Sequence, residues 1–101
     1  MTQQTQSSEY STRRFLMSMV LEIIEDYVRL DSHGTNRNPK YYPDGETEGS
    51  TWRWCNKFLH EEVYLSIGDT LLNFDTITRM LNINSSMALA AIKKERKKRN
   101  G

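Results

Sequence analysis

The sequence predicts a small all-α protein with two long helices joined by a long loop, a short C-terminal helix and a basic tail. Three observations support this fold class. Apolar residues recur at spacings of three and four over residues 12–30 and again from residue 50, no segment requires a strand, and the stretch between is rich in Gly, Asn, Pro and Asp. A length of 101 residues allows one small domain.

The first helix is predicted over residues 12–30. Ser11 or Thr12 can cap its start, and residues 31–34 provide the stop. Residues 1–11, mostly Thr, Gln and Ser, are expected to form a disordered tail. One face of the helix carries apolar residues at helical spacing: Leu16, Val20, Ile23, Tyr27 and Leu30.

Residues 31–49 show neither helical nor strand periodicity, so a flexible loop is expected there. A loop of this length is uncommon in a compact domain and is usually functional, disordered or a tether between helices. The single helical domain is therefore expected to span residues 12–92, with this loop inside it.

A second helical stretch is predicted to begin at Ser50 or Thr51. Apolar residues then recur at spacings of three and four, as in Trp52, Cys55, Leu59, Val63, Ile67 and Leu71. Trp54, Phe58, Leu65 and Leu72 add a second stripe. The helical spacing continues through Phe74, Ile77 and Leu81, and residues 87–92 can form a further short helix.

The pair Gly68-Asp69 lies inside this apolar run, although glycine in a helix interior costs about 1 kcal/mol relative to alanine. Two interpretations are open. Gly68 can end one helix while Asp69 or Thr70 caps the next. Alternatively, the helix is continuous and docks in a partner's groove, where glycine permits close approach and the aspartate pairs with an arginine.

Charge is distributed unevenly along the chain, although the net charge is only +1. Residues 93–99 have a net charge of +5, whereas the rest of the chain carries eight positive and twelve negative side chains, a net charge of −4. Residues 93–101 are therefore expected to form a basic tail that contacts nucleic acid, an anionic membrane surface or a nuclear import receptor, or is merely solvated. Its cations are Lys93, Lys94, Arg96, Lys97, Lys98 and Arg99.

Catalytic and metal-binding patterns are not recognisable in the sequence. His33 and His60 lie in different segments, Cys55 has no Cys or His at metal-ligand spacing, and no Gly-rich phosphate loop occurs. We therefore expect neither an enzyme nor a cofactor or metal site. The apolar runs are too short for a transmembrane segment and no leader opens the chain, which favours a cytoplasmic location.

Residues 64–71, Tyr-Leu-Ser-Ile-Gly-Asp-Thr-Leu, resemble the third homology motif of the Bcl-2 family of apoptosis regulators. In that motif an apolar residue, a small residue and an aspartate precede a final apolar anchor. Residues 21–28 look like the family's first helix, the long loop follows, and residues 79–81 are similar to a segment of Bax-like members. The partner-binding residues implied by the resemblance are Tyr64, Leu65, Ile67, Gly68, Asp69 and Leu71.

The resemblance covers residues 12–84 and implies the front half of a Bcl-2-type bundle, because the family's later segments are absent. It implies a truncated or divergent regulator of apoptosis that acts by protein–protein interaction, presenting its motif helix to the groove of another Bcl-2-family protein. Homodimers and a peripheral location at mitochondria are further expectations from the resemblance.

Residues 74–99 support an alternative hypothesis. The helix, short turn and helix over residues 77–92 are typical of a helix-turn-helix DNA-binding regulator, and the basic tail would contact phosphates and could direct the protein to the nucleus. Asn82 stands where the turn usually has glycine, and residues 87–91 are apolar where polar base-contacting side chains are expected.

Overall fold

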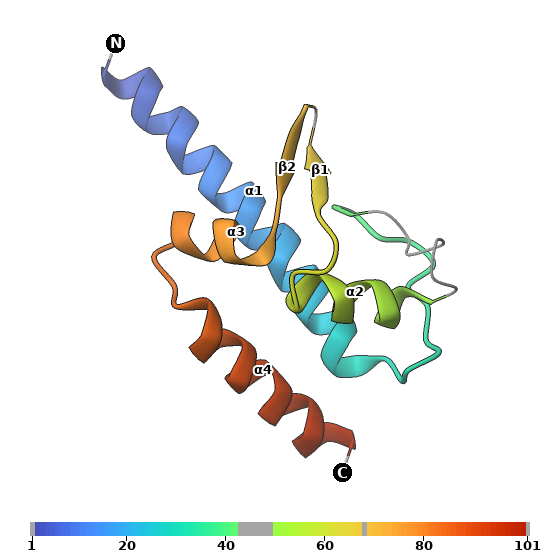
Figure 1. Cartoon of the computed structure of the whole chain (residues 1–101). Coiled ribbons are helices and arrows are strands. Elements are labelled where there is room, and N and C mark those ends of the chain that lie inside the picture. Colours follow the sequence, from blue (N-terminus) through green and yellow to red (C-terminus); the bar gives the residue numbers. More distant parts are fainter. Residues whose placement is uncertain (1, 43–49, 68, 101) are drawn as a thin grey trace.

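The computed structural model describes residues 2–42, 50–67 and 69–100, with side chains from residue 12 to residue 99 of these ranges. This part of the chain forms four helices and one antiparallel hairpin (Figure 1). In chain order they are α1 (Thr2–Arg29), α2 (Thr51–Leu59), β1 (Leu65–Ile67), β2 (Thr70–Leu72), α3 (Phe74–Met80) and α4 (Ser85–Asn100). The fold is therefore mainly helical, as the sequence predicts, but the prediction that no strand is needed is wrong.

One hydrophobic core joins α1, α2, α3 and α4. The predicted apolar face of α1 supplies much of it, since all five of its residues are buried. The apolar side chains that are almost completely buried in the core include Met19, Ile23, Cys55, Phe58, Leu59, Leu65, Phe74 and Ile77. Aromatic rings extend this core, because Trp54 stacks between Tyr42 and Phe58 at centroid distances of 5.2 and 5.4 Å.

Helix α1 is longer than predicted and begins at Thr2, so residues 2–11 continue the helix where a disordered tail was expected. Thr, Gln and Ser have lower helix propensity than Ala or Leu but do not break a helix, and this segment contains neither Gly nor Pro. The predicted stop is confirmed, because α1 ends at Arg29.

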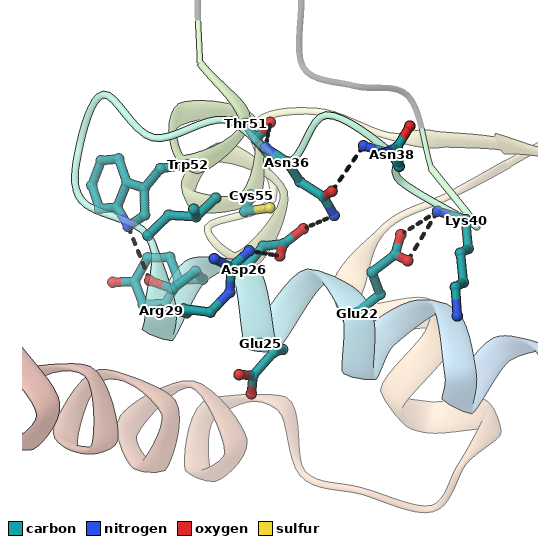
Figure 2. Close-up of polar contacts among 12 residues, drawn as sticks. Glu22, Glu25, Asp26, Arg29, Asn36, Asn38, Lys40, Thr51, Trp52 and Cys55 are labelled. Carbon is teal, nitrogen blue, oxygen red and sulfur yellow. Dashed lines mark hydrogen bonds and ion pairs between the residues drawn. The ribbon is translucent and has the colours of Figure 1, made fainter.

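The first part of the long loop, residues 31–42, is held against α1 by two carboxylates (Figure 2). Glu22 accepts hydrogen bonds from the backbone N–H groups of Lys40 and Tyr41. Asp26, which is 3% exposed, accepts from Asn36 Nδ2 at 2.7 Å and from the hydroxyl of Tyr42. This part of the predicted flexible loop is thus fastened to the helix, and residues 43–49 lie outside the described residues.

Helix α2 begins where the sequence predicts, since the side chain of Ser50 caps it by accepting a hydrogen bond from the N–H of Arg53. It ends far earlier than expected. The N–H groups of Glu61 and Glu62 donate to the carbonyls of Phe58 and Lys57, and Glu61 has a φ of 64°. These two bonds form a Schellman motif, which turns the chain out of the helix and towards β1.

Candidate functional site

The segment predicted to dock as a helix is a β-hairpin. Leu65 pairs with Leu72 and Ile67 with Thr70. Each strand contains a β-branched residue, Ile67 or Thr70, a residue type that favours strands, and the helical prediction for residues 64–71 is wrong.

The hairpin does not place the predicted partner-binding residues on one face. Leu65 is buried in the core at 1% exposure, whereas Tyr64 and Leu71 are 56% and 65% exposed. Asp69 is exposed, Ile67 is half-buried, and Gly68 lies outside the described residues. The helical spacing that would align Ile67, Asp69 and Leu71 towards a groove is therefore not present.

Helices α3 and α4 form a two-helix unit that agrees with the helix, short turn and helix predicted over residues 77–92 (Figure 1). Asn73 caps α3, its Oδ1 accepting from the N–H of Thr76 at 2.7 Å. Asn84 does the same at the start of α4, accepting from the N–H of Met87 at 2.9 Å. The Ser85 hydroxyl donates to Asp75 at 2.9 Å, so the start of α4 is tied to α3.

The turn between α3 and α4 is a second Schellman motif. The N–H groups of Asn82 and Ile83 donate to the carbonyls of Arg79 and Thr78. Asn82 has a φ of 59°, a left-handed conformation that asparagine tolerates better than most residues other than glycine. Asn82 therefore performs the conformational role of the glycine that is usual in this turn.

Helix α4 is much longer than the short helix predicted over residues 87–92, because the basic tail is helical to Asn100. Lys, Arg and Glu are good helix formers, so the charged stretch continues the helix. Its inner face contributes Ile92, which is 7% exposed, together with the half-buried Ala88 and Leu89. The prediction of a separate tail at residues 93–101 is thus wrong for its described part.

Arg96 anchors α4 to the C-terminal end of α1. Its Nη1 donates to the carbonyl oxygens of Tyr27 and Leu30 at 2.5 and 2.7 Å. The guanidinium also lies 5.3 and 4.7 Å from the ring centroids of Tyr27 and Trp52, whose rings stack on each other. A cation placed at the C-terminus of a helix satisfies exposed carbonyls and complements the helix dipole, so Arg96 is a structural residue of the basic run.

The other cations of α4 lie towards solvent. Arg99 pairs with Glu25 at 3.5 Å and with Glu95 at 3.1 Å. Among the residues whose side chains are described, no carboxylate forms an ion pair with the four exposed lysines, which are Lys93, Lys94, Lys97 and Lys98.

The four lysines lie on the same side of α4 as several exposed side chains of its first turns. At 100° per residue, Ser86, Ala90, Lys93 and Lys97 fall within a narrow stripe of the helix, with Met87, Lys94 and Lys98 beside it. All seven side chains are exposed. We call the surface formed by these seven side chains the basic face of α4. The helix has 16 residues and is roughly 24 Å long.

Figure 2 shows a second polar cluster, around Asp26, in which the carboxylate also accepts from Arg29 Nη2 at 3.1 Å and Cys55 lies nearby. Burial raises the pKa of the Cys55 thiol, and the carboxylates of Asp26 and Glu22 raise that pKa further. A protonated, fully buried thiol is a poor nucleophile, so this cluster fastens the loop and does not provide a reactive cysteine.

The aromatic residues that could stack on unpaired bases are committed to the interior. Trp54 and Phe58 are buried. Trp52 is half-buried, stacks on Tyr27 beneath Arg96, and donates its indole N–H to the carbonyl of Tyr27 at 3.1 Å. Trp54 and Phe58 are therefore core residues, and the ring of Trp52 is engaged by Tyr27 and Arg96.

Two of the open grooves in the described part of the chain lie beside α4 and beside the hairpin, and Ser86 of the basic face lines the first. One of about 470 Å³ is lined mainly by Leu59, His60, Phe74, Asp75, Ser85 and Leu89. The other, about 430 Å³, is mostly apolar and lies between α1, the hairpin and α3, with Phe15, Leu16, Ile67, Leu72 and Met80 in its wall.

Comparison with known proteins does not assign the chain to a family, because no protein-family model, curated protein or solved structure matches it. The relationship to the Bcl-2 family therefore stays a prediction. Within the described ranges, none of the helices has the length and apolar character needed to cross a membrane.

Proposed function

We propose that this protein binds double-stranded nucleic acid, with α3 and α4 acting as a helix-turn-helix and the basic face of α4 as the contact surface. One observation carries the proposal. The four exposed lysines lie on the same face of α4 as Ser86, Met87 and Ala90 in its first turns, and α4 follows a turn in which Asn82 is left-handed. In helix-turn-helix proteins the second helix enters the major groove and its N-terminal residues contact base edges.

The distribution of charge supports the proposal. Helix α4 carries six cations and one carboxylate, whereas the rest of the chain has a net charge of −4. A nucleic acid is attracted to the basic face and repelled by the acidic remainder, which limits the orientations in which the protein can bind. Lysines contact phosphates as point charges and do not themselves require a particular sequence.

The anchoring of α4 also supports the proposal. Arg96 fixes the C-terminal half of the helix on α1, and Ser85 fixes its start on α3. A helix held at two points presents its opposite face in one orientation, so less conformational entropy is lost on binding. The internal packing of the tryptophans favours duplexes over single strands, whose recognition commonly uses stacking on exposed aromatic side chains.

The test is a fluorescence anisotropy titration of a labelled DNA duplex with three forms of the full chain. We expect Lys93→Gln/Lys97→Gln to weaken binding roughly tenfold at moderate salt, because two phosphate contacts are lost. The control, Arg37→Gln/Lys40→Gln, removes the same charge from the exposed loop and should bind like the unmodified protein. Equal loss in both variants would mean that net charge, not the basic face, governs binding.

Regulation of apoptosis through a Bcl-2-type groove stays the alternative proposal. It requires residues 64–71 to change from hairpin to helix on binding, and it is supported by the exposure of Tyr64, Asp69 and Leu71. A titration against a labelled pro-survival Bcl-2-family protein separates the two proposals. Saturable binding that is lost with Asp69→Ala and retained in Lys93→Gln/Lys97→Gln would favour groove docking.

A further inference from the structure

We infer that α4 reads thymine, through contact of Met87 and Ala90 with the C5-methyl group, so that the protein prefers duplexes containing A·T pairs. This inference rests on the proposed function and specifies the sequence class that the same surface recognises.

The side chains at the start of the basic face are apolar or small. Met87 is 72% exposed, the most exposed of the large apolar side chains described, and Ser86, Ala90 and Ala91 are also exposed. Between Ser85 and Ile92 the helix has no Arg, Lys, Asn, Gln or carboxylate. Asn84 precedes this stretch, and its side-chain oxygen is engaged by the N–H of Met87.

The chemistry of the major groove limits what these side chains can recognise. Guanine is read chiefly by Arg or Lys, adenine by Asn or Gln, and cytosine by a carboxylate. None of these groups is present in the first two turns of α4, and a serine hydroxyl can pair with several bases. The thymine methyl is the apolar group in this groove, and an apolar side chain removes it from water on contact.

The first turn of α4, which carries Met87, is held in place by hydrogen bonds. The hydrogen bond from the Ser85 hydroxyl to Asp75 ties the first turn of α4 to α3, and the cap by Asn84 satisfies the N–H of Met87 within that turn. Ala90 lies one turn after Ser86 on the same stripe, and its small side chain lets the helix backbone approach the base pairs closely. Lys93 and Lys97 follow on this stripe, where they can reach phosphates on either side of the groove.

The test compares alternating duplexes that differ by one methyl group per A·T or A·U pair, poly(dA-dT) and poly(dA-dU), in the same anisotropy assay. We expect about fourfold tighter binding to the thymine polymer, the value for burial of one methyl group. Met87→Ser should bring this ratio close to one and leave the salt dependence unchanged. The control is Met17→Ser, which removes a 38% exposed methionine from α1 and should keep the ratio.

The outcomes separate this inference from the proposed function. Equal affinity of the unmodified protein for the two polymers would overturn thymine recognition but leave duplex binding intact. If Met87→Ser kept the thymine preference, or Met17→Ser abolished it, the assignment to Met87 would be wrong. Absence of binding to either polymer and to poly(dG-dC) would overturn the proposed function itself.

Discussion

Arg96 has a different role from the five other cations of residues 93–99, because it is turned inward onto α1. Both of its hydrogen bonds to carbonyl groups come from Nη1, and its planar guanidinium lies over two aromatic rings, a contact that the compact ammonium group of a lysine does not reproduce. The sequence contains a signal for this role, since Arg96 follows Ile92 by four residues and therefore lies on the buried face of the helix. Charge counting alone does not reveal it.

We predict that Arg96→Ala lowers the free energy of unfolding by about 2 to 3 kcal/mol, because carbonyls at the end of α1 lose a charged donor and the stacked rings lose their cover. Urea denaturation followed by circular dichroism measures this. Lys97→Ala, one position along the same helix but exposed, should change stability by no more than about 0.5 kcal/mol. Similar losses in the two variants would contradict the anchoring role.

The buried thiol of Cys55 makes the stability of the protein depend on alkaline pH. Burial raises the pKa of Cys55 above its ordinary value of 9.0, so the folded state keeps the proton that the unfolded state releases. The stabilisation is complete below this ordinary value and is lost as the pH rises through it towards the higher pKa of the folded state. The slope approaches about 1.4 kcal/mol of unfolding free energy per pH unit.

Urea denaturation between about pH 7.5 and 9.8 measures this effect, and the comparison with Cys55→Ser removes the contribution of the tyrosines, which begin to ionise at the upper end of this range. We expect the unfolding free energy of the unmodified protein to fall more steeply with pH than that of Cys55→Ser, whose hydroxyl does not titrate in this range. Parallel pH curves for the two proteins would show that the thiol is accessible and titrates normally in the folded state.

At the scale of the elements, the helices were predictable where a stripe, a cap and a stop agree. The apolar face of α1, the cap of α2 at Ser50 and the end of α1 before residues 31–34 are examples. The hairpin could not be predicted from periodicity, because strands of three residues are too short to show a period of two. The spacing of four between Val63, Ile67 and Leu71 also continued the helical pattern of α2.

The end of α2 also has no signal in the sequence. Glu61 adopts a left-handed conformation that usually favours glycine or asparagine, so the residue type at this position does not mark the end of α2. In contrast, Asn82 in the α3–α4 turn is a residue type that tolerates this conformation. The candidate site was therefore predictable as a two-helix unit, whereas the helical continuation to Asn100 and the fixed position of α4 on α1 required the three-dimensional structure.

The hairpin predicts a contrast between two leucines that the resemblance to the Bcl-2 family places among the partner-binding residues. Leu65 is buried in the core, so Leu65→Ala should cost about 2 to 4 kcal/mol of stability. Leu71 is mostly exposed, and Leu71→Ala should cost no more than about 0.5 kcal/mol. Thermal and urea denaturation of the two variants measure the difference. Comparable destabilisation would indicate that residues 64–71 do not form the hairpin.

The whole molecule is an acidic body that carries a basic helix on its surface. Arg96 faces α1, and Arg99 pairs with Glu25 and Glu95, whereas the four lysines face solvent. The exposed positive charge of α4 is therefore concentrated on one face. Such an arrangement makes long-range attraction to a polyanion depend on one face and on ionic strength. We propose that duplex nucleic acid binds to this face.

The salt dependence of duplex binding tests that claim most directly. We predict that the logarithm of the association constant falls linearly with the logarithm of salt concentration between about 50 and 200 mM. In Lys93→Gln/Lys97→Gln the slope should be less steep by about 2, while Arg37→Gln/Lys40→Gln should leave it unchanged. An affinity that is independent of salt, or the same slope in all three proteins, would contradict the assignment of the basic face as the binding surface.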